Sequence, residues 1–142
     1  MTQSMHDTAA AMADILTRYR TVAVVGLSPK SHRDSYEVSQ YMQRNGWRII
    51  PINPNATEIL GETVYPSLTE AARHHPIELV NVFRNSADVP PVVDEAIAIG
   101  AKAIWMQLGV AHEDAAQKAR AAGLAVVQDK CLKVEHRRQL RQ

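Results

Sequence analysis

The chain has 142 residues, of which 46% are hydrophobic and 22% are charged, and this is the composition of one globular domain. Sixteen Lys and Arg residues against fifteen Asp and Glu residues exclude the strongly basic footprint of a nucleic-acid-binding domain, and the single cysteine, Cys131, excludes an internal disulfide framework and a cysteine-cluster zinc site. No apolar run reaches the roughly 18–20 residues of a membrane span, and His6, Asp7 and Asp14 stand where a signal peptide needs basic and then apolar residues, so we expect a reduced, cytoplasmic protein that contacts no membrane.

Strands and helices are predicted to alternate along the chain. Apolar residues at helical spacing from Met12 to Tyr19 indicate an N-terminal helix within residues 1–20. Five apolar runs are typical of strands buried on both faces of a parallel sheet: residues 22–25, 48–54, 78–84, 101–109 and 124–128. A sixth, residues 63–65, precedes Pro66 and is therefore expected at an edge of the sheet.

Helices are expected between these strands. Capping-box patterns at residues 34–37 and 67–70 and the prolines at 90–91 indicate helix starts, residues 115–122 are rich in alanine, and residues 136–142 are expected to be a polar, basic, fraying helix end. The alternation predicts an α/β fold with a doubly wound, mostly parallel sheet of five or six strands and helices on both faces. We expect one Rossmann-like domain over residues 1–142.

In such a fold, ligands bind beyond the carboxyl ends of the strands. The first strand ends at Gly26, which lets a ligand or a helix approach the backbone closely, and the next helix is predicted to begin near Ser35. Between them lie Ser28, Lys30 and Arg33, which supply a hydroxyl and two positive charges. This segment favours a phosphate-binding cradle, with a plain polar surface turn as the alternative.

Two departures argue against NAD as the ligand. Ser28 and Ser31 occupy positions at which the G-x-G-x-x-G fingerprint needs glycine. The second strand ends at Asn53, where an NAD-binding domain usually places Asp or Glu to hold the ribose. An amide can hydrogen-bond without repelling a phosphate, so other phosphorylated nucleotides stay open. A plain turn at residues 53–55 is the alternative.

Two later strand ends carry further candidates. Phe83 stacks on a base or fills the core, and Arg84 points into the crevice or into solvent. Gln107, polar within an apolar run, is either a binding amide or a satisfied buried amide, whereas Trp105 is expected in the core. The spacing of the six histidines and of the carboxylates indicates no metal site and no catalytic constellation, so no enzymatic activity is expected.

Four segments together resemble the small stand-alone CoA-binding proteins, which are single Rossmann-like domains related to the CoA-binding domain of the succinyl-CoA synthetase alpha subunit. They are residues 22–30 (VAVVGLSPK), 52–54 (INP), 61–68 (GETVYPSL) and 129–136 (DKCLKVEH). The resemblance extends over about residues 15–138 and implies that coenzyme A or an acyl-CoA is the bound cofactor and small-molecule partner. It carries over binding and not ligase activity, because a chain this short holds neither the domain with the phosphorylated histidine nor the nucleotide-binding partner subunit.

The resemblance and the strand ends together predict the cofactor-binding residues: Gly26, Leu27, Ser28, Pro29, Lys30, Arg33, Ser35, Asn53, Pro54, Phe83, Arg84, Met106 and Gln107. By position, residues 26–30 would face the pyrophosphate and residues 53–54 the adenosine end. Residues 83–84 would flank the next wall, and residues 106–107 would approach the pantetheine arm. Ala56 stands where the synthetase has a lysine, so Lys30 or Arg33 would replace that phosphate contact.

Cys131 follows the last predicted strand, with Lys130 and Lys133 nearby, and positive neighbours stabilise a thiolate. It is therefore a possible contact for the CoA thiol, as a thiol store or redox sensor; the alternative is a small residue packed under the C-terminal segment. Two other functions stay open. One is a small NAD(P)-linked oxidoreductase or nucleotide sensor, and the other is a protein-interaction module that docks an unknown partner through residues 137–141 and the N-terminal helix.

Overall fold

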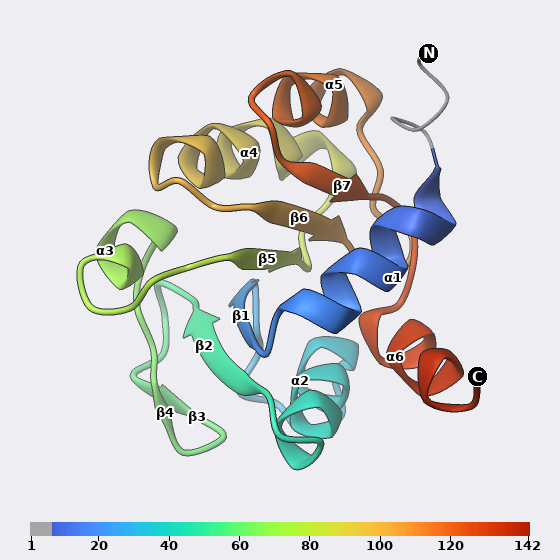
Figure 1. The fold of residues 1–142 in the computed structure, drawn as a ribbon. Coiled ribbons are helices and arrows are strands. Elements are labelled where there is room, and N and C mark those ends of the chain that lie inside the picture. Colours follow the sequence, from blue (N-terminus) through green and yellow to red (C-terminus); the bar gives the residue numbers. More distant parts are fainter. Residues whose placement is uncertain (1–6) are drawn as a thin grey trace.

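A computed structural model describes residues 7–142 of the chain (Figure 1). Five strands form a parallel sheet: β1 (Thr21–Val25), β2 (Arg48–Ile52), β5 (Leu79–Val82), β6 (Ala103–Met106) and β7 (Ala125–Val127). The helices are α1 (Thr8–Arg18), α2 (Asp34–Arg44), α3 (Leu68–Ala72), α4 (Val89–Ala98), α5 (Glu113–Ala121) and α6 (Leu132–Leu140), with a short 3-10 turn at Ser86–Asp88. The predicted fold class and the predicted five main strands are confirmed.

The strand order is β2-β1-β5-β6-β7, with every neighbouring pair parallel. The chain therefore winds from β1 outward to β2 on one side and from β5 outward to β7 on the other. In register, Val25 lies between Ile52 of β2 and Val82 of β5, so these three strands end at the same level. The order reverses between β1 and β5, and this is the point where a doubly wound sheet leaves a crevice.

Helices cover both faces of the sheet, as predicted. Successive strand residues point to opposite faces. Val22 and Val24 pack with buried residues of α1, α2 and α6, whereas Ala23 and Val25 pack with buried residues of α3, α4 and α5. Figure 1 shows these two groups of helices on opposite sides of the strands. The two apolar layers fix the sheet, and through it the positions of the strand ends.

The edge of the sheet beside β2 differs from the prediction. Residues 62–63 form β4 (Glu62–Thr63), which pairs antiparallel with β3 (Glu58–Ile59) in a small separate hairpin. Leu60 and Gly61, both at positive φ, form its two-residue turn. Only Tyr65 reaches the main sheet, through a single parallel bridge to Ile52. Residues 62–63 therefore form one arm of a hairpin and not a sixth strand of the main sheet. The sequence did not predict this hairpin, because residues 58–59, the partner of β4, do not belong to an apolar run.

Both helices begin where the sequence predicted, but only one of the two expected N-caps forms. The Ser67 hydroxyl accepts the Glu70 N–H at 3.1 Å, which caps α3 as expected. Helix α2 begins at Asp34 itself, so Asp34 is its first residue and not its cap, and Arg33 precedes it without a capping side chain. The nearby Ser35 hydroxyl accepts the Ser28 N–H at 3.0 Å instead.

The two ends of the described chain pack on the same face of the sheet. Helix α6 continues to Leu140, so residues 136–142 form the end of a helix, as predicted. His136 attaches this helix to the rest of the fold, because its Nδ1 lies 2.9 Å from the Tyr41 hydroxyl and its ring meets Trp47 edge-on. The predicted N-terminal helix is α1, and residues 1–6, with His6, lie outside the described residues.

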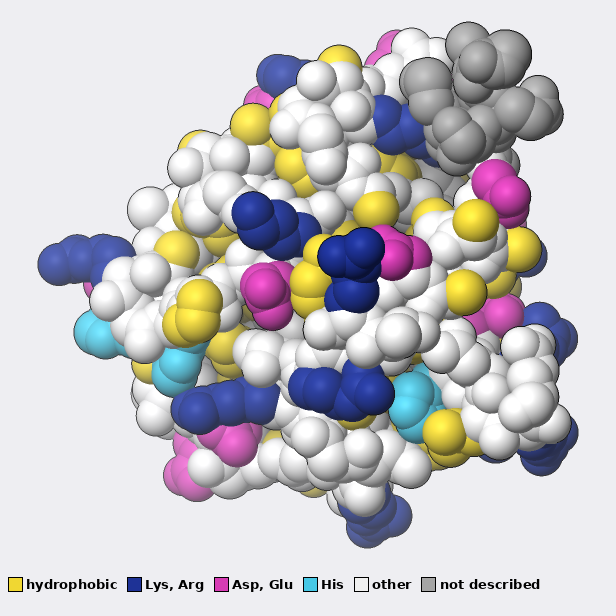
Figure 2. Space-filling view, in the orientation of Figure 1, with side chains coloured by type: hydrophobic (Ala, Val, Ile, Leu, Met, Phe, Trp, Pro, Cys, Tyr) yellow, Lys and Arg dark blue, Asp and Glu magenta, His cyan; other side chains and the backbone are white. Residues whose placement is uncertain are grey.

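The face drawn in Figure 2 carries basic and acidic side chains interspersed with each other. Among residues 7–142, no helix is both long enough and apolar enough to cross a membrane.

Candidate functional site

Gly26 directly follows β1 and lies against the backbone of Phe83, which directly follows β5. It has a φ of +89°, and a Cβ atom at this position would stand 2.2 Å from the carbonyl oxygen of Phe83. The adjoining N–H groups continue the sheet, since Gly26 donates to the Ile52 carbonyl and Phe83 donates to the Val25 carbonyl. Glycine is required here by the chain's own packing, whereas the sequence had suggested a close approach by a ligand.

A cavity of about 460 Å³, the loop cavity, opens after β1. Its lining comes from the β1–α2 segment and the end of β5: Gly26, Ser28, Lys30, Arg33, Asp34, Ser35 and Phe83. The serine hydroxyls shape the loop, because Ser28 Oγ accepts the Lys30 N–H at 3.1 Å and Ser35 Oγ accepts the Ser28 N–H. Each hydroxyl oxygen thus helps to fold the cradle, and each O–H group can still donate a hydrogen bond to a ligand.

Positive charge at the loop cavity comes from Lys30 and Arg33. Both are exposed, and within residues 7–142 neither forms an ion pair with a carboxylate. Both lie at the N-terminus of α2, an eleven-residue helix whose first amides and dipole favour an anion. Asp34 is the one carboxylate in this lining. The loop cavity can therefore hold a phosphate group with two mobile cations and the amides at the start of a helix.

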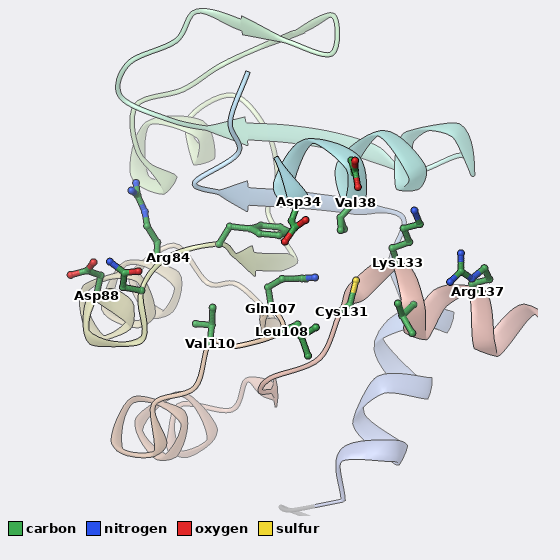
Figure 3. Close-up of a pocket in the computed structure, with 14 residues that line it drawn as sticks. Asp34, Val38, Arg84, Asp88, Gln107, Leu108, Val110, Cys131, Lys133 and Arg137 are labelled. Atoms are coloured by element: carbon green, nitrogen blue, oxygen red, sulfur yellow. The ribbon is translucent and has the colours of Figure 1, made fainter. Parts of the chain in front are cut away.

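A second cavity of about 680 Å³, the strand-end cavity, adjoins the first, because Asp34 and Phe83 line both. It lies between α2 and α6 and beyond the ends of β5 and β6 (Figure 3). Its lining is Asp34, Glu37, Val38, Phe83, Arg84, Asn85, Asp88, Gln107, Leu108, Val110, Cys131, Lys133, Val134 and Arg137. Its size is that of a small-molecule site.

A buried amide pair organises the floor of the strand-end cavity. Asn81 is fully buried in β5, and its Nδ2 donates to the Trp105 carbonyl at 3.1 Å and to Gln107 Oε1 at 3.3 Å. The Leu132 N–H also donates to Gln107 Oε1, at 3.3 Å. Two donors therefore fix which amide atom is the oxygen. The Gln107 Nε2 group has no hydrogen-bond partner among residues 7–142, so its donors face the cavity.

Cys131 lies on the α6 side of the same cavity. It is half-buried and stands at the N-cap position of α6, where its side chain makes no capping hydrogen bond. Lys133 and Arg137 line the cavity from α6, and the Lys133 ammonium lies 5.6 Å from the centre of the Tyr41 ring. Lys130 does not line it; its carbonyl accepts the Trp105 indole N–H at 2.9 Å.

Several predicted contacts take other roles. Leu27 and Met106 are fully buried in the two apolar layers, so their side chains are core and only their backbones can reach a ligand. Asn53 joins two loops: its Nδ2 donates to the Leu27 carbonyl at 2.9 Å, and its Oδ1 accepts the Asn55 N–H at 2.8 Å. Asn53, Pro54 and the exposed Pro29 line neither cavity. These side chains were assigned by position along a strand, which does not reveal what they contact.

The remaining predictions concern aromatic and charged side chains. Phe83 is half-buried and lines both cavities, so it is a wall of the site as well as a neighbour of the core. Arg84 is exposed at the mouth of the strand-end cavity, near Asp88 in Figure 3. Trp105 is fully buried, as expected.

Sequence reasoning missed Asn81, Glu37 and Arg137. A signal for Asn81 was present, because an asparagine within the strand ELVNVFR must find hydrogen-bond partners when it is buried. Glu37 and Arg137 carry no comparable signal, since both are charged residues on helices.

Known proteins resemble this chain over nearly its whole length. A family model described as a CoA binding domain matches residues 20–137. The uncharacterized protein YneT of Bacillus subtilis (strain 168) is 42% identical over 127 residues, which cover 89% of this chain and 93% of that protein. A hypothetical protein from Pyrococcus horikoshii OT3 is 37% identical with a TM-score of 0.89, over 96% of this chain and 94% of that one.

A more distant structure shares the fold alone. It is a dinucleotide-forming acetyl-coenzyme A synthetase 1 from Ca. Korarchaeum cryptofilum, which is 21% identical with a TM-score of 0.65. The match covers 75% of this chain but only 25% of the synthetase chain.

Proposed function

The chain belongs to the CoA-binding domain family, and from this premise we propose that it binds coenzyme A or an acyl-CoA across the loop cavity and the strand-end cavity. The phosphates would lie in the loop cavity, at Lys30, Arg33 and the first amides of α2. The pantetheine arm would pass Phe83 and enter the strand-end cavity.

The observation that carries this proposal is the adjacency of two unlike cavities. The loop cavity combines a helix N-terminus with two cations that no carboxylate pairs among the described residues. The strand-end cavity is larger and presents the amide donors of Gln107 and the apolar side chains of Val38 and Val110. Coenzyme A has the matching sequence of groups, since its phosphates continue into a long, uncharged arm with amide carbonyls.

We further propose that binding occurs without turnover of the ligand. The part of the acetyl-coenzyme A synthetase that this chain matches is a quarter of that protein. A grouping of three or more His, Cys, Asp or Glu side chains suited to a metal ion does not occur within residues 7–142. Of the alternatives, NAD binding has less support, because the Asn53 side chain at the end of β2 already bridges two loops.

A thermal-shift titration with CoA, acetyl-CoA, dephospho-CoA and NAD tests this proposal. Binding to the folded state stabilises it by about 2.7 kcal/mol when the ligand is at 100 times its Kd. We expect CoA to raise the Tm and NAD to leave it unchanged. A smaller rise with dephospho-CoA would implicate a basic contact to the 3′-phosphate, such as Lys30 or Arg33. A rise with NAD alone would contradict the proposal. Mass spectrometry of the starting protein under native conditions controls for ligand carried through purification.

A further inference from the structure

We propose that Cys131 is a covalent capture site for the thiol end of the ligand, and that it forms a mixed disulfide with coenzyme A by exchange with CoA disulfide. This inference rests on the proposed function, because the strand-end cavity must receive the sulfur end of the ligand.

The first observation is the position of the sulfur. Cys131 lines the strand-end cavity and is half-buried, so a slender arm inside the cavity can reach it more easily than a protein surface can. It stands at the N-cap of α6, a nine-residue helix, and it makes no side-chain capping bond. The N–H groups of Lys133 and Val134 have no hydrogen-bond partner among residues 7–142. Free amides at a helix start can donate hydrogen bonds to an acceptor beside the sulfur.

The second, independent observation is the unpartnered amide of Gln107. This residue is only 5% exposed, yet its Nε2 has no hydrogen-bond partner in the described chain. Its oxygen accepts the N–H of Leu132, the residue that follows Cys131, so the amide and the sulfur are held next to each other. In Figure 3 the Gln107 nitrogen points toward the Cys131 side of the cavity. The Nε2 atom itself is open to the cavity, so an acceptor on a ligand can hydrogen-bond to it there.

Charged side chains line other parts of the same cavity. Lys133 and Arg137 line the cavity from α6, and within residues 7–142 neither pairs with a carboxylate. Asp34 and Glu37 line it from α2. Two of the positive side chains thus lie on the helix that follows Cys131, while Arg84 and Asp88 line the cavity from the segment after β5.

The reaction is a thiol–disulfide exchange with CoA disulfide as the oxidant. The Cys131 thiolate attacks one sulfur of CoA disulfide and forms a new S–S bond to it, while the original S–S bond breaks. The second CoA leaves as a thiolate and takes a proton from water. The Cys131 sulfur is oxidised, and the departing CoA sulfur is reduced. Exchange requires no acid–base residue, and the described lining of the cavity contains no histidine. Acyl transfer to Cys131 would call for such a residue.

The loop cavity makes this reaction selective. A disulfide that carries CoA can place its phosphates at Lys30 and Arg33 before exchange, whereas glutathione disulfide cannot. We therefore expect the folded protein to react faster with CoA disulfide by about tenfold, if roughly 1.4 kcal/mol of that binding is retained in the exchange step.

Intact-mass spectrometry over time, with each disulfide at equal concentration, measures this preference. We expect the preference in the wild-type protein and in Lys102→Ala, which removes an exposed lysine at the opposite end of β6. We expect it to fall in Lys30→Ala and to vanish in urea. Gln107→Glu keeps an oxygen for Asn81 and Leu132 but removes the donor, so it should slow the reaction with CoA disulfide more than with glutathione disulfide.

Equal rates with both disulfides in the folded protein would overturn the inference, as would the absence of a CoA adduct. An acyl adduct formed from acetyl-CoA, without any disulfide adduct, would replace it with acyl transfer. A thermal-shift titration of the wild type with CoA under reducing conditions separates the two proposals. A rise in Tm with CoA, together with equal rates for the two disulfides, would support CoA binding and contradict the capture site. No rise in Tm together with equal rates would contradict both proposals.

Discussion

The two cavities of the site are built in different ways. The loop cavity comes almost entirely from consecutive residues between β1 and α2, and its shape depends on backbone and hydroxyl contacts within that segment. The strand-end cavity comes from α2, the ends of β5 and β6 and the start of α6, which lie far apart in sequence. A local motif can therefore be recognised from its letters, whereas a cavity assembled from distant elements depends on buried polar contacts such as that of Asn81 with Gln107. Four predictions test this difference.

The largest effect is expected from a substitution at Gly26, whose backbone lines the loop cavity. Gly26→Ala would place a Cβ 2.2 Å from the Phe83 carbonyl oxygen at a φ of +89°. We expect it to destabilise the fold by at least about 3 kcal/mol, because positive-φ strain alone costs about 1–3 kcal/mol. Urea unfolding measures the loss. Gly123→Ala is the matched control, since its φ is +94° and nothing lies within 4 Å of its Cβ. Equal losses would show that the approach of β5 is not what requires glycine.

The second prediction concerns the buried amide pair at the floor of the strand-end cavity. Asn81→Ala removes the donor to Gln107 and to the Trp105 carbonyl from a fully buried position. We expect a loss of about 2 kcal/mol in the free energy of unfolding. We also expect weaker CoA binding, because the Gln107 amide loses one of the hydrogen bonds that orient it. Asn55→Ala, at an exposed turn, is the control and should change neither. Unchanged CoA affinity in a folded Asn81→Ala protein would show that Gln107 does not depend on Asn81.

A smaller effect separates binding from stability in the loop cavity. Lys30→Ala and Arg33→Ala remove exposed cations that form no ion pair among the described residues. Each should weaken CoA binding by about fivefold to tenfold, or roughly 1 kcal/mol, with little change in Tm. Calorimetric titration at two salt concentrations measures this, because salt screens exposed charges. Lys102→Ala should bind as the wild type does, and an equal loss there would point to non-specific attraction.

The smallest effect is a pH dependence of stability from His136, which packs α6 against the rest of the fold; Cys131 is the N-cap residue of this helix. Burial, and secondarily the positive charge of Arg20, lowers the pKa of His136 below its ordinary value of 6.5. The folded state therefore favours the neutral imidazole, so its contribution to stability is present above about pH 6.5 and is lost as the pH falls through the lowered folded-state pKa.

Urea unfolding from about pH 7 to about pH 5 measures this contribution. His136→Gln should lose less stability over this range than the wild type. His75, whose pKa is lowered chiefly by burial, titrates in the same direction and stays in both proteins as a common background. Parallel pH profiles for the two proteins would show that His136 makes no contribution.

Much of the fold was predictable from the sequence, because the apolar runs are long and are separated by helix signals. The errors fell where the signal was weak. Residues 58–59 have no apolar run, so the β3–β4 hairpin went unseen, and Asp34–Glu37 imitates a capping box although Ser35 is used by the preceding loop. Along the site, Lys30 and Arg33 lie where their segment predicted, whereas Leu27 and Met106 proved to be core.

By itself, the sequence determined the alternation of strands and helices, the loop after β1 and the family resemblance, because hydrophobic periodicity and short motifs are local properties. Only the tertiary structure decided that the Phe83 carbonyl leaves no room for a side chain at Gly26 and that Asn53 joins two loops. It also decided that Asn81 holds Gln107 beside Cys131. Each of these contacts joins residues about 25 or more positions apart, or depends on which face of a strand a side chain occupies. Parallel strands bring such residues to one edge only after the whole sheet has formed.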